Sequence, residues 1–138
     1  MRWGVIGLGG VVQQQIAPAI VHSASSELIA CVGSTAEKTS AFAQAYRVPH
    51  CLRSIEELAA VPEVEAIFIA TPNADHYRMV LAAARGGKHV LCEKPLALAV
   101  EHGREMVEAC RNAGVIFRVA FQIRMEEILN RVREVLTA

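Results

Sequence analysis

The chain has 138 residues, of which 53% are hydrophobic and 20% charged, so it is long enough for one domain with a buried core. Fourteen basic residues balance fourteen acidic ones and neither sign forms a block, which argues against nucleic acid or an anionic membrane surface as a partner. No apolar run approaches the roughly 18 residues of a membrane span, and the first predicted strand leaves no room for a signal peptide, so a cytoplasmic protein is expected.

Short apolar runs alternate with longer segments whose apolar residues recur at helical spacing, the pattern of a parallel sheet with helices on both faces. Strands are predicted at residues 2–7, 27–33, 50–52, 65–70, 89–92 and 115–121. Helices are predicted around residues 12–20, 77–84 and 106–113, at 54–60 after a serine cap, and at 125–136. Left-handed glycine caps are expected at Gly86-Gly87 and Gly114. The predicted fold class is a doubly wound α/β domain with a mostly parallel sheet, a Rossmann fold.

A glycine-rich turn at residues 7–12 joins the first predicted strand to the first predicted helix, which is the setting of a dinucleotide fingerprint. Gly7 permits the tight turn, and Gly9 lets the backbone approach a pyrophosphate that the N–H groups at the helix start would face. The predicted cofactor contacts of this turn are Gly7, Gly9, Gly10 and Val11. Val12 stands where Gly or Ala is usual, so the helix and the strand are expected to lie slightly farther apart. The alternative is a turn without a ligand, which the complete βαβ unit around it disfavours.

The end of the second predicted strand is where an NAD-binding unit carries an Asp or Glu for the ribose 2′-hydroxyl. This chain has Gly33-Ser34-Thr35 there instead, with Lys38 one turn later. Hydroxyl donors and a cation suit a 2′-phosphate, which a carboxylate would repel, so Ser34, Thr35 and Lys38 favour NADP(H) over NAD(H). The alternative is a serine that only caps the next helix, beside a solvated lysine.

Two further motifs follow the fourth and fifth predicted strands. Carboxyl ends of parallel strands meet at one edge of a sheet, where ligands bind. Cofactor contacts are therefore expected from Ala70, Thr71, Pro72, Asn73, His76, Glu93 and Lys94. Lys94 is the candidate catalytic residue, because oxidising an alcohol requires a group that takes the hydroxyl proton. The alternatives are a solvated Lys94 and a His76 that only occupies the polar end of a helix.

These motifs make the chain resemble the Gfo/Idh/MocA family, which takes its name from glucose-fructose oxidoreductase, inositol dehydrogenase and rhizopine catabolism. The resemblance covers essentially the whole chain and rests on Gly7-x-Gly9, on Ala70-Thr71-Pro72-Asn73 with His76, and above all on Glu93-Lys94-Pro95. It implies an NAD(P)-dependent oxidoreductase of hydroxyl groups, in which Lys94 lies beside the nicotinamide and contacts the substrate hydroxyl while Glu93 helps to hold the ribose. The Ser34, Thr35 and Lys38 arrangement also resembles NADP-using members.

The resemblance implies a domain organisation as well. Residues 1–121 would form the dinucleotide-binding domain, and residues 122–138 would cross over, through Gln122 to Arg124 and an amphipathic helix, toward a second domain that binds substrate. Arg124 is therefore included among the predicted cofactor contacts. The family's Gly-Gly followed by Asp-x-Gly-x-His does not occur in the sequence, so the chain is expected to be a fragment of a longer oxidoreductase, with a natural single domain as the alternative. A sugar, cyclitol or related polyhydroxylated compound would be the substrate of the full-length protein. The isolated chain is expected to bind cofactor with little or no turnover.

A missing domain predicts an exposed apolar patch at the carboxyl edge of the sheet and the last helix, through which the chain would self-associate. The dispersed cysteines, Cys31, Cys51, Cys92 and Cys110, are expected to be buried core residues. The histidines show no metal-ligand spacing, so no metal is predicted.

Two other functions are retained as alternatives. One is a non-enzymatic NADP(H)-binding sensor or regulatory module, because a fold does not fix a function. The other is a methyltransferase-like domain that binds S-adenosylmethionine, since glycine-rich turns are shared among such folds. The second alternative leaves Glu93-Lys94-Pro95 unexplained.

Overall fold

The structure, a computed structural model, describes residues 1–137. In this part of the chain, six parallel strands form one sheet. The strands are β1 (Arg2–Ile6), β2 (Glu27–Val32), β3 (His50–Leu52), β4 (Ala66–Ile69), β5 (His89–Cys92) and β6 (Phe117–Val119). Their order is β3-β2-β1-β4-β5-β6, and every neighbouring pair is parallel. The direction of the order changes between β1 and β4, so their carboxyl ends form the switch point at which such sheets bind ligands. The predicted doubly wound α/β fold is confirmed.

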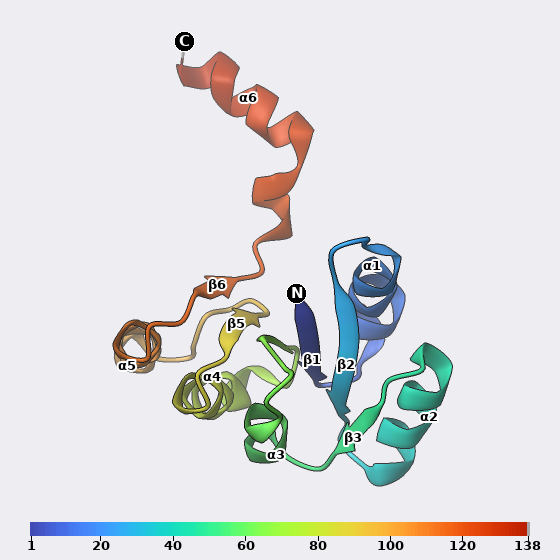
Figure 1. Cartoon of the computed structure of the whole chain (residues 1–138). Helices are drawn as coiled ribbons and strands as arrows, with labels where there is room; N and C mark the ends of the chain where they lie inside the picture. The colour runs from blue at the N-terminus through green and yellow to red at the C-terminus, as the bar shows by residue number, and fades with distance from the viewer. Residues whose placement is uncertain (138) are drawn as a thin grey trace.

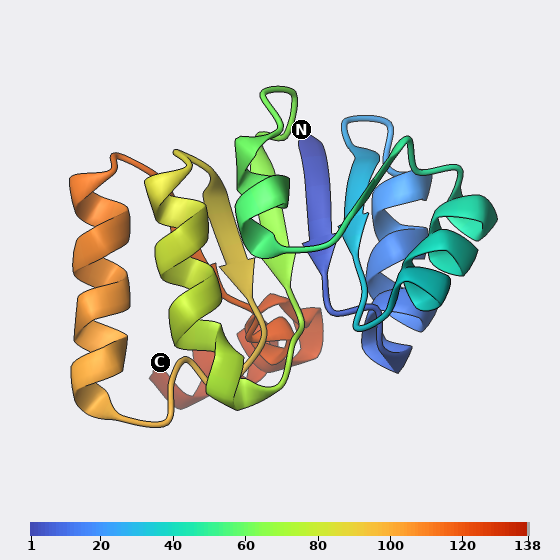
Figure 2. The same cartoon turned by 90° about the horizontal axis from the view of Figure 1, so that it is seen from below.

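Helices cover both faces of the sheet (Figure 1 and Figure 2). One face carries α1 (Ala17–His22) and α2 (Ala36–Tyr46). A π-helical segment (η1, Val12–Ile16) precedes α1 on this face and continues into it. The other face carries α3 (Ile55–Ala60), α4 (His76–Arg85), which a 3-10 turn (η2, Asn73–Asp75) precedes, and α5 (Val100–Asn112). A second 3-10 turn (η3, Gln122–Met125) leads to α6 (Glu127–Thr137), which extends away from the sheet in Figure 1. No helix within residues 1–137 is long and apolar enough to cross a membrane.

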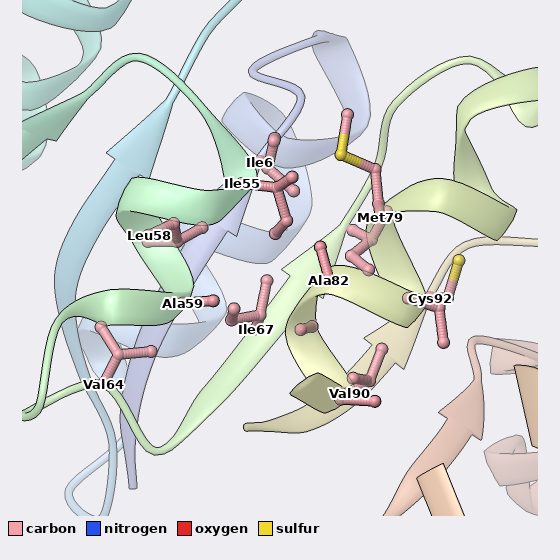
Figure 3. Close-up of a cluster of buried hydrophobic side chains, with 14 of the residues drawn as sticks. Ile6, Ile55, Leu58, Ala59, Val64, Ile67, Met79, Ala82, Val90 and Cys92 are labelled. Atoms are coloured by element: carbon pink, nitrogen blue, oxygen red, sulfur yellow. The ribbon is translucent and has the colours of Figure 1, made fainter. Parts of the chain in front are cut away.

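The two-residue period of the strands divides the apolar side chains between two cores. Along β4, Ile67 and Ile69 enter the core beneath α3, α4 and α5, whereas Phe68 enters the core beneath α1 and α2. Figure 3 shows the first core, where Leu58 of α3 and Met79 of α4 pack over the strands. Burying each large apolar side chain is worth about 1.5–3 kcal/mol, so these two cores fix the sheet on which the motifs lie.

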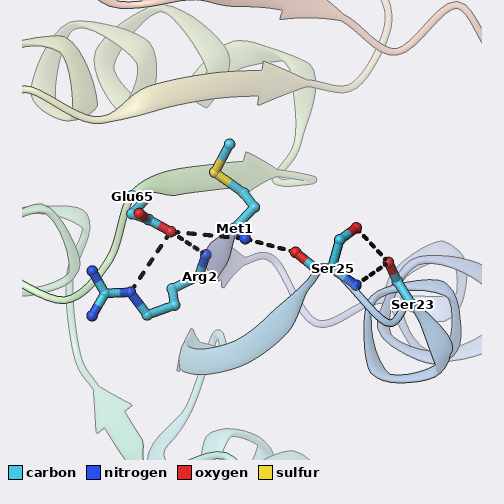
Figure 4. Close-up of polar contacts among 5 residues, drawn as sticks. All are labelled: Met1, Arg2, Ser23, Ser25 and Glu65. Carbon is cyan, nitrogen blue, oxygen red and sulfur yellow. Dashed lines mark hydrogen bonds and ion pairs between the residues drawn. The ribbon is translucent and has the colours of Figure 1, made fainter.

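The amino edge of the sheet, opposite the strand ends that carry the motifs, is held by Glu65 (Figure 4). Its carboxylate accepts a hydrogen bond from the Arg2 backbone N–H at 2.6 Å and lies 3.6 Å from the Arg2 side-chain Nε. The N-terminal ammonium of Met1 donates to the Ser25 carbonyl at 2.7 Å. The Arg2 backbone hydrogen bond, together with the Arg2 and N-terminal charges, lowers the pKa of Glu65. These contacts fasten β1 to the segments that begin β2 and β4.

Two of the three predicted glycine caps are confirmed, because Gly87 and Gly114 have φ values of 69° and 67°. The expectation for Gly86 is wrong, since its φ is −78°. A Cβ on Gly86 would lie 2.7 Å from the Cβ of Ala59. Gly86 is therefore a close-packing residue that lets the end of α4 lie against α3.

The buried state predicted for the cysteines is confirmed for Cys31, Cys92 and Cys110 and is wrong for Cys51, which is exposed. Cys51 lies on β3, a short strand at the edge of the sheet, where one side has no neighbouring strand within the described residues. Burial raises the pKa of the Cys31 and Cys92 thiols to about 12. These thiols remain protonated in neutral solution and act as small apolar side chains.

Iodoacetamide in mildly alkaline buffer is expected to label Cys51 well before the other three thiols, because the exposed thiolate is the reactive form. Mass spectrometry of proteolytic peptides after brief labelling of the native chain measures the order. Cys51→Ser is the control and should abolish the fast labelling. Labelling of Cys31 or Cys92 at the rate of Cys51 would contradict the burial described above.

The last helix presents apolar side chains to solvent. Leu129, Val132, Val135 and Leu136 of α6 are exposed. The exposed apolar side chains predicted on the last helix are therefore present, while the part of the patch at the carboxyl edge of the sheet and the self-association stay predictions. Ala138, the last residue of the predicted crossover segment, lies outside the described residues.

Candidate functional site

The glycine-rich turn leaves β1 at Gly7, which has a φ of 90°. Its backbone N–H donates to the Val32 carbonyl of β2 at 3.0 Å. A Cβ on Gly7 would lie 2.4 Å from the Ala70 carbonyl oxygen, closer than atoms can approach. Gly7 thus brings the turn into contact with the segment that follows β4, in agreement with the tight turn predicted for it.

The helix after the turn begins with a π-helical segment. The Ala17 N–H donates to the Val12 carbonyl, five residues earlier, and the Gln13 carbonyl instead accepts from the Tyr46 hydroxyl at 2.6 Å. Val12 itself is fully buried against the sheet. A π turn is wider than an α turn, and such turns are frequent at functional sites. The bulky third fingerprint residue is therefore accommodated beside a locally widened helix.

Three segments that are far apart in sequence meet at the carboxyl edge of the sheet. They line a pocket of about 230 Å³ formed by Gly9, Gly10, Val11, Val12, Ala70, Thr71, Glu93 and Lys94. A Cβ on Gly9 would meet no protein atom within 4 Å, so nothing inside the described protein requires glycine there. The buried hydroxyl oxygen of Thr71 has no hydrogen-bond partner among the described residues. An open glycine backbone and an unpaired hydroxyl are the features of a surface that a polar ligand completes.

The segment after β5 supplies Glu93 and Lys94, whose bond to Pro95 is cis. One carboxylate oxygen of Glu93 accepts from the Lys94 backbone N–H at 3.3 Å, and the other accepts from the Gln122 side-chain amide at 3.1 Å. The Lys94 side chain is exposed at the mouth of the pocket. Glu93 therefore connects the pocket to η3 through its hydrogen bond with Gln122. The spacing of the motifs in the sequence does not reveal this hydrogen bond.

His76 occupies the first position of α4 and is fully buried. Its ring lies between the two loops that follow β4 and β5, 3.1 Å from the Thr71 carbonyl oxygen and 3.0 Å from the Pro95 carbonyl oxygen. The sequence predicts that His76 contacts the cofactor, and the alternative is a histidine that only occupies the polar end of a helix. In the structure it lies behind the pocket residues and contacts the backbone of both loops.

The other predicted contacts lie outside the pocket lining. Pro72 and Asn73 are exposed at the start of η2. Arg124 lies in η3 with its guanidinium 5.6 Å from the centre of the Phe121 ring, beside a groove along β6. The structure therefore does not bring Arg124 together with the glycine-rich turn.

The end of β2 carries the predicted 2′-phosphate residues, Ser34, Thr35 and Lys38, all exposed. Thr35 is the N-cap of α2, because its side chain accepts from the Lys38 backbone N–H at 3.2 Å. The cap is therefore Thr35 and not the serine of the predicted alternative, while Ser34 and the Lys38 ammonium form no side-chain hydrogen bond or ion pair with the described residues. The turn is fixed by Thr39, whose hydroxyl accepts from the Gly33 N–H at 2.9 Å.

Sequence reasoning missed one cation near this turn, Arg53. In the parallel pairing of β2 with β3, Val32 is opposite Leu52, so Arg53 follows β3 where Gly33 follows β2. Its backbone N–H donates to the Glu57 carboxylate at 2.8 Å, and its exposed guanidinium forms no ion pair with the described residues. The strand order β3-β2-β1 is the signal that would have identified it.

A family model described as an oxidoreductase family with an NAD-binding Rossmann fold matches residues 1–121. The chain belongs to this family, Gfo/Idh/MocA. The resemblance seen in the sequence is therefore confirmed. The chain is 39% identical over 123 residues to 1,5-anhydro-D-fructose reductase of Ensifer adhaerens, covering 89% of this chain. It is 33% identical over 138 residues to D-xylose 1-dehydrogenase (NADP(+)) 2 of Haloferax volcanii, covering 100% of this chain.

Solved structures agree with this assignment. A probable dehydrogenase from Thermotoga maritima has a TM-score of 0.93 and 27% identity over 99% of this chain. Biliverdin reductase from Synechocystis sp. PCC 6803, solved in complex with biliverdin and NADP+, has a TM-score of 0.85 and 29% identity over 99% of this chain. The chain spans only 37% of the Ensifer reductase, 42% of the Haloferax dehydrogenase and 41% of the Thermotoga structure. Among residues 1–137, no group of three or more His, Cys, Asp or Glu side chains could hold a metal ion.

Proposed function

We propose that this chain is the cofactor-binding part of an oxidoreductase that transfers hydride between NADP(H), with NAD(H) as the alternative, and a hydroxyl or carbonyl carbon of a sugar, cyclitol or related compound. The observation that supports this proposal is the pocket in which the glycine-rich turn meets Thr71 and Lys94. The Ensifer and Haloferax relatives are named for 1,5-anhydro-D-fructose and D-xylose, which are polyhydroxylated compounds. Residues 1–121 would hold the cofactor, and residues 122–138 would lead toward the part that binds substrate.

The pocket residues fit a dinucleotide. The open backbone of Gly9 and the N–H groups at the start of η1 would receive the pyrophosphate, because a helix N-terminus with accessible N–H groups favours an anion. The unpaired hydroxyl of Thr71 and the Glu93 carboxylate would bind the nicotinamide ribose. When bound, the cofactor accepts or supplies the hydride.

Lys94 would accept and donate the proton in this reaction. Oxidation of an alcohol breaks its C–H and O–H bonds, so a base must take the hydroxyl proton as hydride leaves the carbon. The neutral amine of Lys94 would take that proton, and its ammonium form would return it in the reverse reaction. Glu93 would keep the motif in place through its bonds to the Lys94 N–H and to Gln122. In the isolated chain we expect cofactor binding with little or no turnover.

The preference for NADP(H) is proposed from the charges around the end of β2. Lys38 and Arg53 would flank a 2′-phosphate beside Ser34. Glu37 is the opposing charge at this end of α2, and its own backbone N–H and Thr35 lower the pKa of its carboxyl. Because Glu37 is ionised in neutral solution, the two cations must outweigh its repulsion of the phosphate.

Calorimetric titration of the chain tests this proposal. NADPH is expected to bind with a dissociation constant at least about tenfold lower than that of NADH, as for a phosphate held by two cations. Lys38→Ala and Arg53→Ala should each weaken NADPH binding and leave NADH binding unchanged. Arg118→Ala, at an exposed arginine of β6 far from this turn, is the control and should change neither. Absence of binding by both nucleotides would refute the proposed function, and equal binding of both would refute the NADP preference.

A further inference from the structure

The ring of His76 joins the two loops that frame the nicotinamide end of the proposed site. Its Nδ1 is 3.0 Å from the Pro95 carbonyl oxygen and its Nε2 is 3.1 Å from the Thr71 carbonyl oxygen. The contact with Thr71 ties the ring to the loop before α4, and the contact with Pro95 is the side-chain hydrogen bond from this segment to the loop after β5 among the described residues. Thr71 and Lys94, one residue before Pro95, both line the pocket. The histidine thus bridges the backbone on either side of the site.

Both atoms that the ring contacts are acceptors. A carbonyl oxygen cannot donate and a neutral imidazole carries one N–H, so the neutral ring donates to only one of the two carbonyls. The bridge between the loops requires the proton on Nδ1, which faces the Pro95 carbonyl. A buried carbonyl that loses its donor is destabilising, because it is removed from water without gaining a hydrogen bond in exchange. Removing the ring would leave the Pro95 carbonyl without this donor and would remove the buried side chain that lies between the two loops, which would then move. The position of Lys94 relative to Thr71 therefore depends on His76.

We propose that His76 is a positioning residue for the nicotinamide end of the site. Because it is fully buried, it sets the separation of the two loops without touching cofactor or substrate. This inference rests on the proposed function in one respect, namely that the nicotinamide lies between Thr71 and Lys94. Binding of the adenosine end of the cofactor, near Ser34 and Lys38, should not depend on His76.

Two substitutions separate the two contacts. The amide nitrogen of asparagine lies near the position of histidine Nδ1, so His76→Asn keeps the donor to Pro95. The longer glutamine places its amide nitrogen near the position of Nε2, so His76→Gln keeps the contact with Thr71. His22→Gln is the control, because the His22 ring is also bonded to one backbone carbonyl, that of Pro18 at 2.7 Å, but lies exposed at the end of α1.

Hydrogen–deuterium exchange of the chain without ligand tests the bridge by itself. In His76→Gln, peptides covering residues 93–98 should exchange faster than in the parent chain, while residues 7–12 should be unchanged. His76→Asn should restore protection of residues 93–98. Unchanged exchange at residues 93–98 in His76→Gln, or equal acceleration throughout the chain, would overturn the proposal. This measurement needs no cofactor, so it decides the role of His76 even if the proposed function fails.

Binding measurements test the consequence for the site. Adenosine 2′,5′-bisphosphate reports the adenosine end alone, and NADPH reports both ends. We expect His76→Gln to bind the bisphosphate like the parent and NADPH about tenfold more weakly, the loss of roughly one hydrogen bond, with His76→Asn closer to the parent. If His76→Gln weakened the binding of both ligands equally, the histidine would be purely structural and the inference would be rejected. Unchanged NADPH affinity in both variants would also reject it. Failure of the parent chain to bind NADPH would count against the proposed function alone.

Discussion

Replacing Gly7 with alanine is expected to lower the free energy of unfolding by about 3 kcal/mol or more, the cost of a side chain in strained backbone with no space around it. Gly7 has a φ of 90°, and its Cβ would lie 2.4 Å from the Ala70 carbonyl oxygen and 2.7 Å from the Thr71 nitrogen. Both neighbours are backbone atoms of the segment after β4, so they cannot rotate away as a flexible side chain would. Relief requires that β1 and β4 separate at the switch point.

Gly87→Ala is the matched control. Gly87 also has a positive φ, 69°, but an added Cβ would meet nothing within 4 Å. Its replacement should cost only the left-handed strain of about 1 kcal/mol. Urea unfolding followed by circular dichroism measures both variants. The difference between them isolates the clash with Ala70, and equal destabilisation would show that β1 and β4 do not approach as closely as described.

The parts of the fold that sequence predicts well are those set by local chemistry or by topology. Ser54 caps α3 and Gly87 ends α4 through interactions within a few residues, so composition and spacing identify them. The meeting of Gly9, Thr71 and Lys94 spans most of the chain, yet it follows from the single rule that carboxyl ends of parallel strands share an edge. Once the alternation of strands and helices is recognised, the location of the pocket is fixed.

The residues that sequence reasoning misplaced depend on contacts between distant segments. The sequence shows that His76 lies near the start of a helix, but not that the loop containing Pro95 contacts its ring. Arg53 lies near the end of β2 because β3 is the neighbour of β2, and the exposed Cys51 lies on β3, the edge strand of the sheet. In each case the strand order decides the environment of the residue, and a pattern of nearest neighbours in sequence contains no information about it.

Replacing Gly9 with valine is expected to weaken NADPH binding by about 100-fold, because two methyl groups would occupy the surface against which the pyrophosphate should lie. The free energy of unfolding should change by less than about 1 kcal/mol, since an added Cβ meets no protein atom within 4 Å and the backbone there is not left-handed. Gly9→Ala should weaken binding less than Gly9→Val. Calorimetric titration and urea unfolding of the same preparations measure the two effects.

Gly7 and Gly9 are separated by one residue, and the comparison between them distinguishes a glycine required by the fold from one required by a ligand. Gly7 is packed against Ala70 by the protein itself, so its replacement should reduce stability whether or not a cofactor exists. Gly9 has no such neighbour, so the protein gains nothing from glycine at this position unless something binds there. If Gly9→Val left NADPH affinity unchanged, the pyrophosphate would not lie at the turn, and the site would have to be rebuilt from Thr71 and Lys94 alone.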